Sequence, residues 1–341
     1  MQDFRSDTKV PDHVDIAPSV SFIAIGRNQA RTLRPCLESV FRAARRAGLE
    51  SFEVIFVDSG SSDESVPLVR SLFGASVRIV SLTGAMNAGI ARNVGARTAA
   101  GKVLFFIDGD MEVDADFLRE ALDPGHALVH PVVTGQLPEK LYDPSGRPVG
   151  DASDRYRIRM RHHRPELGGV FLIDQALFRR IGGFAPELRS NEDLDLGLRL
   201  ARAGVLTLAL PCPIAIHHTV EYLEWARLLP MIRNGSLLYP GALFRRHVTN
   251  RHYWPILASH QRATAVLLAS IGLALWLDPL WLGLYLAYVG AKNLRRPGVS
   301  LLQDLVGTTA RSICFLIGVV AFAPARVPAE SITFAVSNSP P

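Results

Sequence analysis

The sequence predicts an α/β domain built on a mostly parallel sheet, followed by a C-terminal region of hydrophobic helices. Apolar runs typical of buried strands alternate with segments of helical spacing through the first 110 residues. Acidic clusters directly follow two of these runs, and apolar residues are in excess after residue 260. Because strands and helices that alternate in this way form right-handed βαβ units, the first observation predicts parallel strands.

The composition is that of a folded chain larger than one small domain. It has 341 residues, of which 48% are hydrophobic and 20% charged, and its 27 glycines and 22 prolines exclude collagen-like and low-complexity classes. Three distant cysteines form neither a disulfide framework nor a zinc spacing, which suits a reducing compartment. A net charge of +5 suits an anionic partner such as nucleotide phosphates, lipid headgroups or nucleic acid.

The first half of the chain supplies the parallel strands. We expect strands at 20–25, 54–57, 77–82 and 103–107, and helices at 32–46, 64–73 and 87–100. Ligands of such sheets bind beyond the carboxyl ends of the strands. The acidic clusters 58–63 and 108–110 fall at those ends, which predicts a site there.

The pattern becomes mixed beyond residue 125. We expect strands at 128–134, 168–173, 205–210 and 214–217, helices at 175–181 and 192–203, and a small hairpin or excursion at 137–154. Four arginines then alternate with other residues, at positions 155, 157, 159 and 161. They predict either one basic face of an extended segment, directed at phosphates, lipid or acceptor, or a solvated basic loop.

Asp108-Gly109-Asp110 is the most informative motif. Two carboxylates at a strand end can share Mg²⁺ or Mn²⁺, which then neutralises charge on a departing diphosphate. The alternative is an acidic β-turn. A phosphate-binding P-loop is excluded, because no Lys-Ser/Thr follows Gly84 to Gly89, and neither a dinucleotide fingerprint nor a serine nucleophile elbow is present.

Two further pairs of residues have a functional and a structural interpretation. Glu192-Asp193 opens a helix that Asn191 is expected to cap. The structural interpretation is that the helix dipole favours acidic residues at this end. The functional interpretation is that one of the pair is a general base. His217-His218 follows a strand. It predicts either a third metal ligand or a hydrogen-bonded histidine pair near the nucleotide.

Five segments occur in an order that resembles family 2 glycosyltransferases of the GT-A fold, over Ser19 to His218. They are VSFIAIGRN, VIFVDSGSSDES, NAGIARNVGARTAAGKVLFFIDGD, GGVFLIDQALFRRIGGF and NEDLDLGLRLARAG. The resemblance implies a Rossmann-like nucleotide-sugar-binding sheet, a UDP- or GDP-sugar donor and a glycan or lipid-linked acceptor.

The resemblance also assigns roles to residues of the donor side. Asp58 would contact the nucleobase, Arg92 and Asn93 would approach the nucleotide, and Asp108 would face ribose or metal. Asp110 would be the main metal ligand. Asn28 stands where the family often has an Asn-Glu pair, but Gln29 replaces the acid here, and Asp63 is expected to cap the next helix.

On the acceptor side, Asp193 would be the base and Glu192 would shape the acceptor pocket. One base and one Lewis acid suffice for direct displacement at the anomeric carbon, which predicts inversion of configuration. Partial burial of Asp193 is expected, because a base needs a pKa near the working pH.

The C-terminal region predicts contact with a membrane. Residues 263–291 carry one ionisable side chain, Asp278, which precedes Pro279 near the middle. With basic residues on both flanks, this pattern favours a hairpin whose ends both face the cytoplasm. A re-entrant or interfacial helix pair is the alternative. We expect a third apolar piece at 312–325 and an amphipathic helix at 221–239.

The resulting organisation is a tail at 1–18, a catalytic domain at 19–220, linking helices at 221–260, membrane-associated helices at 261–326 and a tail at 327–341. The predicted function is metal-dependent, inverting transfer of one sugar at the cytoplasmic face of the inner membrane. The Q-x-x-R-W motif of processive relatives is absent. Transfer to polyprenyl phosphate, and a non-catalytic nucleotide-sugar scaffold, are the alternatives. Binding of nucleic acid is not expected.

Overall fold

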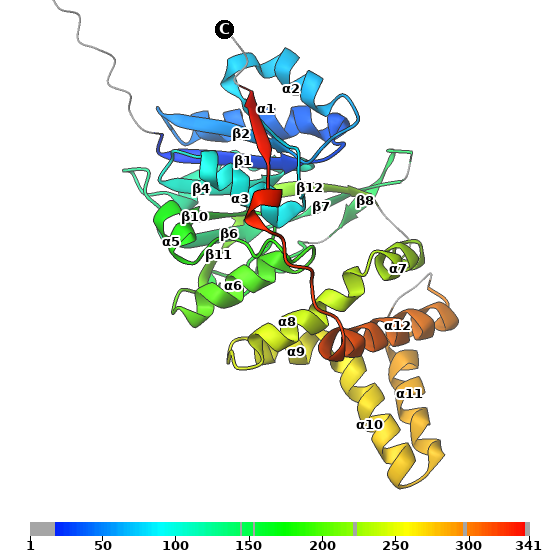
Figure 1. The fold of residues 1–341 in the computed structure, drawn as a ribbon. Helices are drawn as coiled ribbons and strands as arrows, with labels where there is room; N and C mark the ends of the chain where they lie inside the picture. The colour runs from blue at the N-terminus through cyan, green and yellow to red at the C-terminus, as the bar shows by residue number, and fades with distance from the viewer. Residues whose placement is uncertain (1–17, 144, 153, 221–223, 296–298, 338–341) are drawn as a thin grey trace, which may run out of the picture.

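The computed structural model describes residues 18–143, 145–152, 154–220, 224–295 and 299–337. Figure 1 shows an α/β domain with a separate group of C-terminal helices beneath it. The predicted α/β class is therefore confirmed. The predicted N-terminal tail lies outside the described residues, apart from Pro18.

A large mixed sheet forms the centre of the domain. In the described residues it has nine strands, in the order β13 (Phe334–Ser337), β3 (Arg78–Leu82), β2 (Phe52–Asp58), β1 (Val20–Gly26), β4 (Val103–Asp108), β10 (Phe171–Asp174), β6 (Val132–Gln136), β11 (Thr207–Pro213) and β9 (His162–Arg164). Strands β1 to β4 are parallel to their neighbours among themselves, as predicted. Strands β10, β9 and β13 pair antiparallel, so the whole sheet is more mixed than the sequence indicated.

The parallel register brings distant residues to one edge of the sheet. Gly26 of β1 pairs with Asp58 of β2, and Ile25 pairs with Asp108 of β4. The loops that follow these strands therefore leave the sheet side by side. This edge is where the sequence places its acidic clusters.

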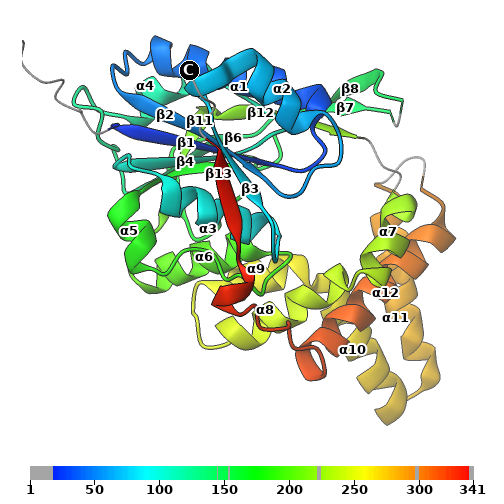
Figure 2. The ribbon, with the colours of Figure 1, turned by 45° about the horizontal axis from the view of Figure 1, so that its top comes forward.

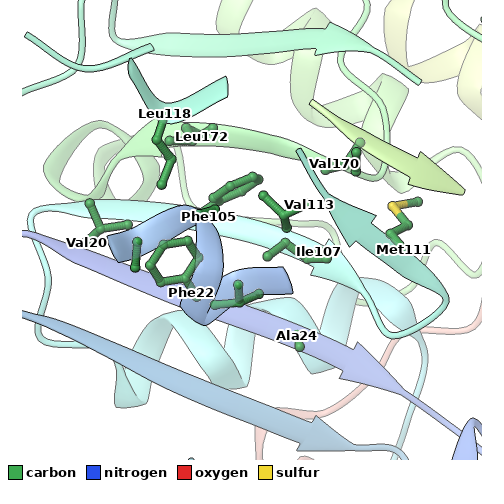
Figure 3. Packing of buried hydrophobic residues seen from close by; sticks show 14 of the residues in the cluster. Val20, Phe22, Ala24, Phe105, Ile107, Met111, Val113, Leu118, Val170 and Leu172 are labelled. Carbon is green, nitrogen blue, oxygen red and sulfur yellow. The ribbon is translucent and has the colours of Figure 1, made fainter. Parts of the chain in front are cut away.

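Helices cover both faces of the large sheet. One face packs on α1 (Ala30–Arg46), α2 (Ser65–Phe73) and α4 (Phe117–Ala121), and the other on α3 (Ala88–Thr98), α5 (Gln175–Arg180) and α6 (Glu192–Arg202). Figure 3 shows Phe22 and Phe105, from β1 and β4, packed between strands and helix on the first face. Because side chains alternate along a strand, Ile23 and Phe106 pack on the other face. Burial on both faces explains the continuous apolar runs.

A small second sheet extends the same edge. Its strands, in order, are β5 (Met111–Val113), β12 (Ala215–Val220), β7 (Glu139–Tyr142) and β8 (Pro148–Ala152). Strands β7 and β8 form the hairpin that was one of two expectations for residues 137–154. Pairing of β12 with β5 and β7 brings His217 beside Glu139 and Met111.

Of the two interpretations of the arginine run, the structure supports the solvated basic loop, because a turn at Arg155 and Tyr156 and a positive φ of 53° at Arg157 interrupt the alternation. The predicted cap of α6 is wrong. Asn191 occupies the position before α6 but has a φ of 63° and no side-chain capping bond. Its left-handed backbone directs the side chain away from the first free N–H groups of the helix.

The C-terminal helices are α7 (Glu224–Arg233), α8 (Tyr239–His247), α9 (Tyr253–His260), α10 (Arg262–Trp276), α11 (Leu282–Asn293) and α12 (Leu301–Val320). The expected apolar hairpin is present as α10 and α11, joined by the turn at Asp278. The linking helix ends at Arg233, earlier than expected, and residues 221–223 lie outside the described part of the chain. The third apolar piece begins at Leu301 and is longer than expected.

By length and composition, α12 is the one described helix that could cross a membrane alone. Helices α9 and α10, bent by 71° at their junction, pass the same criterion as a pair. After α12 the chain returns to the large sheet, where β13 pairs with β3 (Figure 2). The segment predicted to be a C-terminal tail is thus partly an edge strand.

Candidate active site

A cavity opens at the carboxyl edge of β1, β2 and β4. Its volume is about 340 Å³, and it is lined by the ends of these strands and by the start of α3: Ile25, Gly26, Arg27, Gln29, Ser59, Met86, Asn87, Ala88, Asp108 and Asp110. Both carboxylates of the Asp-Gly-Asp motif therefore line one cavity. It lies at the edge of the sheet where the sequence places its acidic clusters.

Arg92 joins the two ends of the candidate site. This α3 residue is 2% exposed, and its guanidinium donates to Asp108 Oδ1 at 2.7 Å and to Glu192 Oε1 at 3.0 Å. Burial alone would lower the pKa of Arg92, but the surrounding carboxylates, chiefly Asp108, raise it. We expected Arg92 to approach the nucleotide. In the structure both terminal nitrogens are committed to carboxylates that lie far apart in the sequence.

Burial also affects the two carboxylates that Arg92 binds. It raises the pKa of Asp108 and that of Glu192, while Arg92 opposes the rise in both cases. The backbone approaches closely here, since a Cβ at Gly169 would lie 3.0 Å from Asp108 Oδ2 and 3.2 Å from Arg92. Glycine at this position therefore lets the loop before β10 pack against the ion pair.

A chain of polar contacts runs from Asp110 across the small sheet. Its Oδ2 lies 3.6 Å from His217 Nε2, His217 Nδ1 lies 3.0 Å from Glu139 Oε1, and Arg155 binds the same Glu139 oxygen at 2.9 Å. Burial alone would lower the pKa of His217, but Asp110 and Glu139 raise it. His218 instead contacts the Tyr142 hydroxyl at 2.7 Å. Both histidines thus have protein partners, as one of the two interpretations required.

Asp110 has an oxygen suited to a cation. Its Oδ1 is buried and has no hydrogen-bond partner in the part of the chain that the structure describes. Across the same residues, no group of three or more His, Cys, Asp or Glu side chains is arranged to hold a metal ion. A cation at this site would therefore take further ligands from outside the described protein groups, as Mg²⁺ and Mn²⁺ commonly do.

Asp193 lies in the first turn of α6, and its Oδ1 accepts the N–H of Leu194 at 2.7 Å. The residue is half-buried, as expected for a base. Burial raises the pKa of the nearby Tyr156 to about 12, with further contributions from Asp193 and Asp108. Asp193 and Asp108 therefore both lie within electrostatic range of the Tyr156 hydroxyl.

Three other predicted residues organise the surrounding loops. Asp58 accepts the N–H groups of Gly60 and Ser61, both at 3.2 Å. Asn28 accepts the N–H of Ser62 at 2.8 Å, so it ties the loop after β1 to the loop after β2. Asn93 binds both backbone groups of Phe184, at 2.8 and 2.9 Å, and its amide is thus engaged with protein.

Asp63 behaves as the sequence predicted. Its carboxylate accepts the N–H of Ser65, the first residue of α2, at 3.0 Å. It also accepts the N–H of Ala30, the first residue of α1, at 3.1 Å. One side chain thereby stabilises the N-termini of two helices.

Sequence reasoning missed several residues of the site. Gln29 lines the cavity, and its Oε1 is buried without a hydrogen-bond partner among the described residues. Asn87 lines it as well and caps α3 by accepting the N–H of Ile90 at 2.8 Å; its place before an alanine-rich helix was the available signal. Glu139 begins β7 and Tyr156 lies in the turn of the arginine run, and no sequence pattern marks either residue.

Comparison with known proteins agrees with this geometry. Residues 21–187 match the family model described as Glycosyl transferase family 2. The chain is 32% identical over 201 residues to the succinoglycan biosynthesis protein ExoO of Rhizobium meliloti, covering 55% of each protein. It is 29% identical over 240 residues to a Drosophila melanogaster protein named as an inactive polypeptide N-acetylgalactosaminyltransferase 11, covering 63% of this chain and 42% of that one. The chain thus spans about half the length of the curated relatives it matches.

A solved structure supports the fold. A Pyrobaculum calidifontis mannosyltransferase, described in complex with GDP-Man and Mn²⁺, aligns with a TM-score of 0.54 and 18% identity over 90% of this chain and 88% of that one. At this identity the likeness establishes the fold alone. The matched family model identifies residues 21–187 as a family 2 glycosyltransferase domain, and the solved structure supports its GT-A fold.

Proposed function

We propose that the protein is a metal-dependent, inverting glycosyltransferase that moves one sugar from a nucleoside-diphosphate sugar to an acceptor hydroxyl. The observation that carries the proposal is the bridge from Arg92 to Asp108 and Glu192. This bridge places the cavity of Asp108 and Asp110 next to the start of α6, which bears Asp193. Donor and acceptor chemistry then meet at one place.

On the donor side, Asp58 and the loop that Asn28 supports are proposed to bind the nucleoside of UDP or GDP. Asp110, with its unpartnered oxygen, and Asp108 would hold Mn²⁺ or Mg²⁺. A bound divalent cation supplies charge neutralisation for the leaving diphosphate. Arg92 donates to Asp108 and opposes the rise in the pKa of this carboxyl that burial causes.

On the acceptor side, Asp193 is proposed to be the general base. As the acceptor oxygen bonds to the anomeric carbon, its proton passes to a carboxylate oxygen of Asp193. The bond from that carbon to the diphosphate breaks, and its electron pair leaves with the diphosphate. A single displacement inverts the configuration, so an α-linked donor yields a β-linked product.

The acceptor is proposed to be a glycan or lipid-linked glycan at a membrane, with the catalytic domain on the cytoplasmic side of the inner membrane. Exposed apolar residues on the C-terminal helices support this location. The name of the Rhizobium relative links that protein to a glycan pathway.

Calorimetric titration of Asp110→Ala tests the donor site. We expect UDP or GDP to bind wild-type protein in the presence of Mn²⁺, and binding to weaken about tenfold or more in the variant, since one metal ligand is lost. Asp116→Ala, which removes an exposed carboxylate from an ion pair with Arg46, is the matched control and should bind normally. Equal affinity of Asp110→Ala and wild type would contradict the assignment. A panel of nucleotide sugars, scored for diphosphate release and product configuration, then identifies the donor.

A further inference from the structure

The hairpin of α10 and α11 exposes an apolar tip. Of the large hydrophobic side chains that are exposed in the described residues, most lie between Leu268 and Val320. At the tip, Leu275, Trp276 and Leu280 are 85%, 84% and 85% exposed. A contiguous apolar surface of this kind marks a binding surface for protein or membrane.

Neither arm of the hairpin is long enough by itself to cross a bilayer as a straight helix. Helix α10 has 15 residues and α11 has 12, which correspond to about 22 and 18 Å at 1.5 Å per residue. The hydrocarbon core of a bilayer is about 30 Å thick. The turn is satisfied internally, because the Asp278 carboxylate accepts the N–H of Leu280 at 2.7 Å. The hairpin is therefore long enough to enter one leaflet and return.

Helix α12 is long enough to cross but is held against the rest of the protein. Near its end, Arg245 of α8 donates to the carbonyls of Gly318 and Val319 at 2.6 and 2.7 Å. Closer to its start, Leu228 of α7 lies beside Gly307. Figure 1 shows α12 running across the base of the hairpin, at an angle to α10 and α11 and packed against α8.

The helical layer formed by α7, α8 and α12 also contacts the catalytic domain. His247 and Arg246 of α8 contact the buried carboxylate of Asp195, on the helix that bears Asp193, at 3.0 and 3.1 Å. If α12 crossed the membrane while packed on α8, the ion-paired groups of α8 would enter the bilayer. Burying such groups in hydrocarbon is costly. This layer is also basic: residues 224–320 contain ten Lys or Arg and three Asp or Glu.

We propose that the α10–α11 hairpin is a monotopic anchor. It enters one leaflet of an anionic bilayer and returns, while α12 lies at the headgroup level and no described segment crosses. Arg262 at the start of α10 and Arg295 after α11 lie at the base of the hairpin, where they meet lipid phosphates. The proposal deepens the membrane association stated above but does not depend on transferase activity.

Flotation with vesicles of phosphatidylcholine and phosphatidylglycerol tests the surface. The double variant Leu275→Ser/Leu280→Ser should partition about tenfold or more weakly than wild type, because two leucine side chains no longer gain from burial. The matched control is Leu72→Ser/Met160→Ser, which changes two exposed apolar residues of the catalytic domain and should partition normally. Equal partitioning of the tip variant and wild type would overturn the proposal.

Cysteine labelling of the full chain in vesicles tests the topology. With labelling of the native cysteines subtracted, Leu277→Cys should be protected from a membrane-impermeant maleimide on both sides, whereas exposed Ala75→Cys should react from the catalytic side. Reaction of Cys at 277 from the opposite side would show a crossing hairpin, and free reaction from the catalytic side would show a hairpin outside the membrane. Either result overturns the proposal. Sugar transfer measured in detergent is scored separately, so that loss of turnover contradicts only the proposed function.

Discussion

Arg92 holds together carboxylates that sequence reasoning treats as separate motifs. In Arg92→Gln, Asp108 and Glu192 lose their shared cation while remaining largely buried, so we expect a loss of about 3 kcal/mol in the free energy of unfolding. Arg92→Lys keeps the positive charge but can bind only one of the two carboxylates, so its free energy of unfolding should fall by less. Urea unfolding measures both variants.

The control for Arg92 is Arg34→Gln, which removes an exposed pair with Glu38 and should change stability by less than about 1 kcal/mol. If Arg92→Gln were as stable as Arg34→Gln, the bridge would have no structural role. Weakened donor binding in Arg92→Gln, at temperatures where it is folded, is the expected functional consequence.

At the scale of residues, the sequence located the acidic side chains of the cavity better than it indicated their protein partners. Asp108 and Asp110 are recognisable because they end an apolar strand, and Asp63 because it precedes a helix. The partner of Asp108 was not predictable, since Arg92 lies inside an alanine-rich helix and meets Glu192 only through the fold. The prediction that Asn191 caps α6 failed for a similar reason. The residue type favours a cap, but the left-handed backbone at Asn191 does not allow the capping hydrogen bond.

Between α6 and α8, a buried polar cluster predicts a pH effect on stability. Burial alone would raise the pKa of Asp195, but His247, Arg199 and Arg246 hold it below the ordinary value. The ionised carboxylate therefore stabilises the fold above its unfolded pKa of about 3.9, and this stabilisation is lost as pH falls through the lower folded-state pKa.

Asp195→Asn should accordingly lower the free energy of unfolding by about 3 kcal/mol at neutral pH. The difference from wild type should shrink at acidic pH, where Asp195 itself becomes protonated. Denaturant unfolding across pH measures it, with exposed Glu50→Gln as control. A difference that stays constant or grows toward low pH would contradict the assignment.

Residues 321–333, the C-terminal strap, connect α12 to the edge strand β13 and contact the loop after β3, whose Met86 and Asn87 line the cavity. The N–H groups of Thr83 and Ala85 donate to the carbonyls of Thr333 and Ser331 at 2.9 and 2.8 Å. A Cβ at Gly84 would collide with the Ser331 carbonyl, so Gly84→Ala should displace the strap. Hydrogen exchange at the two amides should accelerate.

The control for the strap is Gly283→Ala, where a Cβ meets nothing within 4 Å. Unchanged protection of Thr83 and Ala85 in Gly84→Ala would mean that the strap tolerates the added methyl group. Sequence alone did not indicate this strand. Four residues at the end of a chain have too little periodicity to distinguish an edge strand from a tail.

For the whole molecule, the parallel core was predictable because doubly buried strands appear as apolar runs. The antiparallel strands β9, β10 and β13 were not predictable, since their pairing depends on where long connecting segments return to the sheet. Helix α12 was underestimated because Gln303 and Asp304 interrupt its apolar sequence. In the fold, Lys292 binds the Asp304 carboxylate at 2.9 Å, which allows the helix to begin earlier.

The overall arrangement places a GT-A domain on a basic helical layer from which an apolar hairpin projects (Figure 1). Asp195 and the strap each connect that layer to an element of the candidate site. The proposed anchor is therefore joined both to α6, which bears the proposed base, and to the loop after β3. This organisation is consistent with the proposed transfer to an acceptor at a lipid surface.

The central claim is that carboxylates from β4 and α6 serve one reaction. Kinetics of Asp193→Asn, with donor affinity measured in parallel, test it most directly. We predict that kcat for nucleoside-diphosphate release falls by about 10²-fold or more while the donor Kd is unchanged, because the variant removes the base and leaves the donor cavity intact. An unaltered kcat, as a phosphate acceptor that needs no base would allow, or a loss of donor binding would contradict it.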